Sequence, residues 1–509
     1  MTMNFKDPIN LFKAVYSVGL LIFSVIYIMG MIGISETKLS GDVSPALAYF
    51  AIWGAVLWLT MVEGGQASLV GLDPVNRELY KESHPIAYKI AEVSNVGDNL
   101  DRYLLGRQFM VVAIVFIVNM SGAPNEGAEL WGFPDIVTDI FLGSGLAMIL
   151  FTCMVGQLNT QVNASHCMLD YIDNYFGYFT FWVAMAIEFS GLLHAAYVVA
   201  MLVSWAAGKK IESKEPPKEG FALAFFWARC ALSCFILAMC FAVTLTALFN
   251  DQTTMWADVP PEAAIVVFFI LLCVVGMLEG MQIAFFAVAK IPEAERGESL
   301  FAKKTCNLLY SGEGTNLPGF MIGRQLCVVS CMFFVARVTS VDLAEGEDNI
   351  FGVSDSMQEL FNTGLLGAHI VTIVGSISWQ LVASAFPLAF LANPLTYYLL
   401  RLCLFLESTG ICTGAWVLAA IHKKICGFQR DEVHIGTAEE RAKKNLADDT
   451  VHVGVGHMIK LPGFVENAPP ALVELLKKNQ NVSQYINAVI EDVESAAKSE
   501  HGTPVVAEP

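Results

Sequence analysis

Residues 63–66 read EGGQ, and residues 279–282 read EGMQ, 216 positions later. The tripeptide GRQ follows each motif after nearly the same gap, at 106–108 and at 323–325. Chance does not explain two such motifs with matching gaps, so they predict two copies of one structural unit in this chain.

Further positions of the two halves match at similar offsets. They include a proline that opens a hydrophobic run, an asparagine and a glutamate from later in each half, and a looser pair of glutamines. The pairs are Pro45 and Pro261, Asn174 and Asn393, Glu188 and Glu407, and Gln157 and Gln380.

The composition predicts a membrane protein. Of the 509 residues, 55% are hydrophobic and only 15% are charged, whereas soluble domains carry about 25% charged residues. Hydrophobic runs of roughly 20 residues, the length of a membrane-crossing helix, recur as far as residue 421. We therefore expect an all-α integral membrane protein with ten transmembrane helices. The candidate spans are 12–34, 46–70, 104–120, 136–158, 179–206, 222–249, 262–289, 320–341, 359–391 and 397–421.

Ten spans give five per copy, so the second copy would enter the membrane from the opposite side. This predicts two pseudo-symmetric five-helix repeats in an inverted arrangement, as in many secondary transporters. The loop charges conflict with it. Lys and Arg gather in both 71–104 and 290–319, and the positive-inside rule would place these loops on one side. That alternative requires parallel repeats with an even number of spans per copy.

The predicted organisation has five parts. They are a first repeat at 1–206, an inter-repeat linker at 207–221, a second repeat at 222–424, a polar cytoplasmic linker at 425–469, and a C-terminal helix with a disordered tail at 470–509. The first apolar run lacks a small-residue cleavage site, so we interpret it as a span and not as a signal peptide.

The C-terminal helix carries a heptad pattern. Its apolar positions are Leu472, Leu475, Val482, Ile486, Val489 and Val493, with Asn479 at an a position. This predicts a short coiled coil, which could join chains into a homo-oligomer. The alternative is an amphipathic helix on the protein's own cytoplasmic face.

Several functional classes are disfavoured. The net charge of −18 argues against a nucleic-acid partner, because phosphate binding needs a basic surface. The sequence contains no nucleotide-binding or catalytic motif. We therefore expect that the protein is not an enzyme, that its transport is not driven by ATP and that it holds no cofactor. Twelve cysteines without a CxxC pair are typical of reduced thiols in apolar helices.

The repeated motifs supply the candidate site. Glutamate and glutamine three residues apart share one helical face, and ionisable groups at membrane depth usually pair or line a water-filled path. Amides offer both donors and acceptors, which suits a neutral, hydroxyl-rich solute. The alternative is that each glutamate pairs with an arginine and only holds helices together. The candidate residues are Glu63, Gln66, Arg107, Gln108, Glu279, Gln282, Arg324 and Gln325.

Other polar residues fall inside the hydrophobic runs. Glu188 and Glu407 rank second because the repeat relates them, whereas His194 and His369 are interpreted as core histidines. The remaining ones are Asp139, Arg229, Arg337 and Arg401.

The paired EGxQ and GRQ motifs, the ten predicted spans and the run Cys167-Met168-Leu169-Asp170 resemble the silicon transporters of diatoms, over residues 10–430. The resemblance implies sodium-coupled import of orthosilicic acid across the plasma membrane, with both termini in the cytoplasm. It makes the eight motif residues substrate ligands and sodium the coupling ion, with sodium ligands that cannot be identified. A passive channel for small neutral hydroxylated solutes is the alternative.

A zinc site near the fourth span is not expected. His166, Cys167 and Asp170 lie close in sequence, but they lack a clear fourth ligand.

Overall fold

The structure is a computed structural model that describes residues 7–73, 75–125, 128–208, 215–256, 259–289, 299–311, 316–343 and 347–436. In these ranges the chain is helical and contains no strand. Contacts divide the chain into a first unit, residues 1–431, and a second unit, residues 432–509. The predicted coiled coil and most of the linker before it lie outside the described residues, so the following paragraphs concern the first unit.

The helices of the first half follow in chain order. They are α1 (Pro8–Gly33), α2 (Lys38–Asp42), α3 (Pro45–Leu72), the 3-10 turn η1 (Arg77–Leu79), α4 (Pro85–Ser94), α5 (Asn99–Ser121), α6 (Asp135–Thr138), the π-helix η2 (Asp139–Gly143), α7 (Leu146–Phe151), the π-helix η3 (Thr152–Leu158), α8 (Asn159–Ala164), α9 (Met168–Ile172), α10 (Tyr175–Phe189) and α11 (Ala195–Ala207).

The second half has a similar sequence of elements. They are α12 (Gly220–Phe249), α13 (Pro261–Ala289), α14 (Leu300–Leu309), α15 (Asn316–Thr339), the 3-10 turn η5 (Ile350–Gly352), α16 (Asp355–Asn362), α17 (Leu365–Ile370), the π-helix η6 (Val371–Ile377), α18 (Ser378–Ala385), α19 (Pro387–Leu391), α20 (Pro394–Ser408) and α21 (Gly414–Cys426). The short α22 (Asp431–Ile435) follows.

Long apolar helices dominate the fold. By length and composition, six helices in the described ranges can cross a membrane: α1, α3, α12, α13, α15 and the run from α17 through α18. The pair Asp135–Gly143 and Leu146–Ala164, bent by 48°, makes a seventh. The structure therefore supports a multi-pass helical membrane protein, whereas the number of ten spans stays a prediction.

The motif helix α3 shows why these segments are helical. Ser44 accepts a hydrogen bond from the Leu47 amide and Pro45 occupies the first turn, both of which favour a helix start. Its 28 residues span about 42 Å. A Cβ on Gly64 would collide with the Tyr171 ring. The glycine thus permits close packing, and the helix does not unwind there.

The predicted fifth and tenth spans are each two half-length helices. α10 and α11 have 15 and 13 residues, about 22 and 20 Å, which is too short for a bilayer core of about 30 Å. The same lengths recur in α20 and α21. Gly191 and Gly410, both with positive φ, lie at the two breaks.

The pair α10–α11 starts and returns on one side of the bundle. Just before α10, Asp173 accepts hydrogen bonds from the Ile86 and Ala87 amides at the start of α4. After α11, Glu215 forms an ion pair with Arg102 in the first turn of α5, at 2.5 Å. Because α4 and α5 follow one another directly, both ends of the pair lie at the same side. These contacts therefore do not support the predicted fifth crossing at 179–206.

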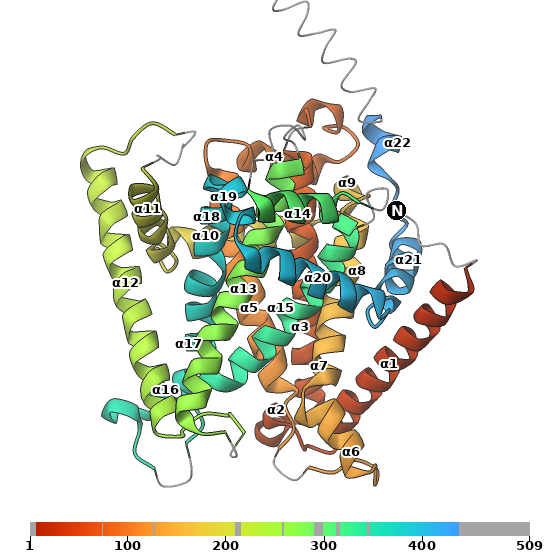
Figure 1. Ribbon diagram of the computed structural model, residues 1–509, viewed down its shortest axis with the longest axis vertical. Helices are drawn as coiled ribbons and strands as arrows, with labels where there is room; N and C mark the ends of the chain where they lie inside the picture. The colour runs from red at the N-terminus through yellow and green to blue at the C-terminus, as the bar shows by residue number, and fades with distance from the viewer. Residues whose placement is uncertain are drawn as a thin grey trace, which may run out of the picture. The chain divides into compact units, whose positions relative to one another are not determined.

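Loop contacts contradict the inverted arrangement. Lys38, after α1, forms an ion pair with Asp342 at 2.8 Å, and the Asp342 amide donates to the carbonyl of Gln252, after α12. These two loops occupy matching places in the halves, so inversion would put them on opposite sides. Figure 1 likewise shows α4 and α14 towards one end of the bundle and α6 and α16 towards the other. The physical reason is that the fifth apolar run of the first half turns back, so that it begins and ends on one side of the bundle.

Each helix break is held by the first long helix of the other half. Ser233 of α12 accepts from the Ala195 amide at 2.9 Å and donates to the Leu192 carbonyl at 2.6 Å. In the same way, Ser17 of α1 bonds the Gly414 amide and the Ile411 carbonyl. The two halves thus support each other reciprocally.

Candidate functional site

The first motif pair meets where α3 packs against α5. Arg107 donates to Glu63 at 2.6 Å, to the side-chain oxygen of its neighbour Gln108 at 2.7 Å and to the Val62 carbonyl at 3.4 Å. Glu63, Arg107 and Gln108 are all at least 96% buried. One guanidinium therefore fixes both a carboxylate and an amide.

The second motif pair makes the same contacts where α13 packs against α15. Arg324 donates to Glu279 at 2.9 Å, to Gln325 at 2.7 Å and to the Leu278 carbonyl at 3.1 Å. These side chains are equally buried.

The glycine of each GRQ motif sets the position of its arginine. A Cβ on Gly106 would overlap the Ala184 carbonyl of α10, and one on Gly323 would overlap the Cys403 carbonyl of α20. The half-length helices therefore pack directly on the motif helices, which only a glycine permits.

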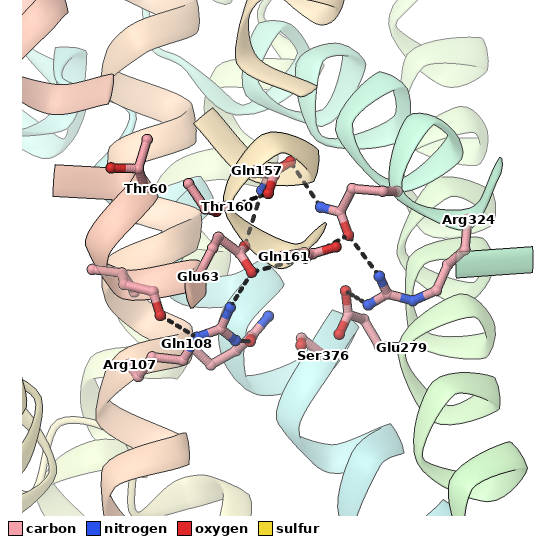
Figure 2. Close-up of polar contacts among 12 residues, drawn as sticks. Thr60, Glu63, Arg107, Gln108, Gln157, Thr160, Gln161, Glu279, Arg324 and Ser376 are labelled. Atoms are coloured by element: carbon pink, nitrogen blue, oxygen red, sulfur yellow. Dashed lines mark hydrogen bonds and ion pairs between the residues drawn. The ribbon is translucent and has the colours of Figure 1, made fainter. Parts of the chain in front are cut away.

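Glutamines join the two arginine–glutamate pairs. Gln157 of η3 donates to Glu63 at 3.1 Å and accepts from Gln325 at 2.7 Å. Gln161 of α8 donates to Glu63 at 3.1 Å and also approaches Gln325, at 3.5 Å. Figure 2 shows this chain of contacts running from one half of the molecule to the other.

The second carboxylate is held by a glutamine of its own half. Gln380 of α18 donates to Glu279 at 2.7 Å. Each glutamate therefore accepts hydrogen bonds from one arginine and from at least one glutamine, so every carboxylate oxygen has a partner. Such hydrogen bonds offset the cost of burying a carboxylate–guanidinium pair.

All eight residues predicted from the motifs line a single cavity. Gln157, Gln161 and the apolar side chains of Val111, Val328 and Met332 complete its wall. Its volume of about 10 Å³ leaves room for about one water molecule. Two carboxylates and two guanidiniums leave this lining without net charge.

A family model described as Silicon transporter matches residues 5–504. The chain belongs to the silicon transporter family. Comparisons with curated proteins and with solved structures gave no match. Together with the long apolar helices, membership supports a multi-pass membrane protein of a transport family.

The second-rank glutamates lie outside the cavity lining. Glu188 is buried and accepts from the Tyr197 hydroxyl at 3.2 Å, with His194 3.8 Å away. Its counterpart Glu407 is only partly buried. The two glutamates thus have unequal surroundings, unlike the motif residues.

The remaining polar candidates also lie outside the cavity lining. Arg229 donates to the Phe189 carbonyl at the end of α10. Arg337 donates to the Thr254 carbonyl and stacks on Trp256, and His369 is buried beside Phe109. These contacts join helices and loops to one another.

The sequence analysis paired Gln157 with Gln380, and this correspondence needs correction. Gln161 and Gln380 each donate to the motif glutamate of their own half and lie 219 residues apart, as do Asn174 and Asn393. The π-helices η3 and η6 also begin 219 residues apart. A constant offset of 219 through the later part of each half was the signal that identifies Gln161.

The run Cys167–Asp170 lies away from the cavity. Asp170 contacts His84 at 2.9 Å and accepts from the Gln429 amide. Asp431 accepts from the amides of Met168 and Leu169. The segment therefore joins α4, α9 and the chain that follows α21.

Proposed function

We propose that this protein imports silicic acid across the plasma membrane as a sodium-coupled symporter that works by alternating access. The observation that carries the proposal is the charge balance of the cavity. Each buried carboxylate is neutralised by an arginine within 3 Å, and glutamines form the rest of its polar lining. Silicic acid is neutral and carries four hydroxyl groups that both donate and accept, which matches amides and paired carboxylates.

Alternating access is supported by the size of the cavity. A solute of one silicon and four oxygens does not fit into space for about one water molecule. We infer that the described conformation is closed, and that the hydrogen bonds of Gln157 and Gln161 to Gln325 break when the site opens.

We further propose that the halves are two copies in parallel orientation. Each copy would contribute four crossing segments and one half-helix pair, with α5 as the counterpart of α15. This arrangement puts the basic loops 71–104 and 290–319 on the cytoplasmic side, as the positive-inside rule requires, and both termini with them.

The test is uptake into proteoliposomes with and without an inward sodium gradient, using silicic acid or its germanium analogue. Coupling predicts accumulation above the equilibrium level, because each charge entering at −60 mV adds about 1.4 kcal/mol. Uptake that only equilibrates, with or without sodium, would establish the channel alternative instead. Absence of any silicic acid flux would refute the proposed substrate.

A further inference from the structure

The two halves place the same residue types at four matching positions of the hydrogen-bond network and different types at one. Glu63 and Glu279, Arg107 and Arg324, Gln108 and Gln325, and Gln161 and Gln380 make corresponding contacts. The exception lies in the π-helices, where Gln157 of η3 occupies the place that Ser376 occupies in η6, 219 residues later.

This difference makes the site asymmetric. Gln157 is long enough to cross between the halves, and it accepts from the Gln325 side-chain amide at 2.7 Å. The serine side chain is shorter, and within the described part of the chain its hydroxyl accepts a hydrogen bond from Gln380 of its own half, at 3.5 Å. Both side chains are fully buried.

The counterpart of Gln325 is consequently left with a spare donor. Among the described residues, the side-chain nitrogen of Gln108 makes no hydrogen bond, although its oxygen accepts from Arg107. Gln108 is 2% exposed and lines the cavity. In Figure 2 its amide points towards the central space between Gln161 and Ser376.

We propose that the hydrogen bond between Gln157 and Gln325, called the strut below, holds the site closed before the solute binds. We further propose that Gln108 is the amide that binds the solute first. The inference rests on the proposed function, because it assigns unequal roles to two residues of the same site. The strut holds Gln325 and keeps the cavity at the size of one water molecule. A hydroxylated solute must replace this bond, whereas Gln108 is available to it from the start.

The first test replaces Gln157 with its counterpart residue. Gln157→Ser removes two hydrogen bonds, the one from Gln325 that bridges the halves and the one to Glu63. Because the bond from Gln325 belongs to the closed state, we expect the competent fraction to rise and the half-saturation concentration for silicic acid uptake to fall by about two- to tenfold. Ser376→Gln adds a second strut, to Gln108, and raises that concentration by about tenfold or more. Ser408→Ala, whose exposed hydroxyl bonds to a carbonyl of its own helix outside the cavity lining, is the control and should behave like the wild type.

The decisive test combines both changes. Gln157→Ser with Ser376→Gln moves the strut to the other half and frees Gln325 in place of Gln108. We expect the double variant to return to within about threefold of the wild-type half-saturation. A double variant no better than Ser376→Gln alone, or a Gln157→Ser variant with unchanged or weaker affinity, would overturn the proposal.

A measurement without solute separates this inference from the proposed function. Cysteine placed at Val111, in the cavity wall, reports opening through its reaction with a small thiol reagent, compared with the same chain lacking that cysteine. Gln157→Ser should speed this labelling by about two- to tenfold. An unchanged rate would reject the strut even if the wild type transports silicic acid. A faster labelling rate in a protein that does not transport silicic acid would support the proposed role of Gln157 and refute the proposed substrate.

Discussion

At the scale of single residues, the decisive feature is that each buried arginine satisfies three acceptors at once. It binds a glutamate, its neighbouring glutamine and a backbone carbonyl of the facing helix. Such a fork needs the planar, always charged guanidinium, which lysine does not supply. The arginine therefore both neutralises the carboxylate and orients the amide.

Removing one arginine is expected to leave an uncompensated charge. Arg107→Met should lower the free energy of unfolding by about 3–5 kcal/mol, because Glu63 stays buried without its partner. Adding Glu63→Gln should restore most of this loss, as measured by thermal unfolding in detergent. If the pair only holds helices together, the restored double variant should also transport. We expect it to be folded and inactive.

The glutamines of the EGxQ motifs are expected to act on one solute. Gln66 and Gln282 come from different halves and line the same cavity. Each change to alanine should cost roughly 1–3 kcal/mol of binding, a tenfold to hundredfold loss of affinity. The double variant should fall short of additivity, because the site acts as a unit. Half-maximal flux at unchanged affinity in each single variant would instead indicate two independent pathways.

At the scale of elements, the half-helix pairs are the unexpected feature. Each begins at an asparagine whose side chain caps the first helix, Asn174 for α10 and Asn393 for α20. Each then breaks next to a glycine with positive φ. The last carbonyls and first amides at such a break need partners inside the bundle, and the serines of α1 and α12 provide them.

The serine contacts at the breaks are expected to be needed for stability. Ser233→Ala removes the partner of both the Leu192 carbonyl and the Ala195 amide. It should destabilise the protein by about 1–3 kcal/mol, because these buried groups are left unpaired. Ser408→Ala, whose hydroxyl is exposed and bonds only within its own helix, is the control. Equal melting temperatures for the two variants would show that the break is held by other contacts.

At the scale of the whole molecule, the arrangement of the halves decides which loops share a side. Cysteines at Glu82 and Ser311, both exposed, should react with an impermeant reagent from the cytoplasmic face. Cysteines at Glu129 and Asp251, also exposed, should react from the outer face. Labelling of positions 82 and 311 from opposite faces would contradict the parallel arrangement and support the inverted one.

The C-terminal region gives a second prediction at this scale. Asp431 accepts from two amides of α9, so truncation after Gly427 removes a contact of the helical bundle and should lower its stability. Truncation after Gly436 keeps that contact and should leave insertion and uptake intact, if the heptad helix serves assembly only. Loss of uptake in a correctly inserted protein ending at Gly436 would assign that helix a role in transport.

The sequence alone predicted the membrane class and the eight motif residues that line the cavity. Both predictions rest on features of the linear sequence, namely hydrophobic runs of about 20 residues and the recurrence of rare motifs. The sequence also contained the alternative topology that we propose, because the positive-inside rule predicts that the basic loops 71–104 and 290–319 lie on one side. Hydropathy could not show that 179–206 turns back. A half-helix pair buried in a bundle is as apolar as a crossing helix, and only the glycine at its break differs.

The folded chain added the partners of these residues. Gln157 and Gln325 are hydrogen-bonded although 168 positions separate them in the sequence. No local pattern encodes which buried amide contacts which carboxylate. That choice depends on the close packing of α5 against α10 and of α15 against α20, which fixes how deep each arginine lies. The motifs therefore predicted the residues of the candidate site. The helix packing determined the charge balance of that site, its small volume and the asymmetry between Gln157 and Ser376.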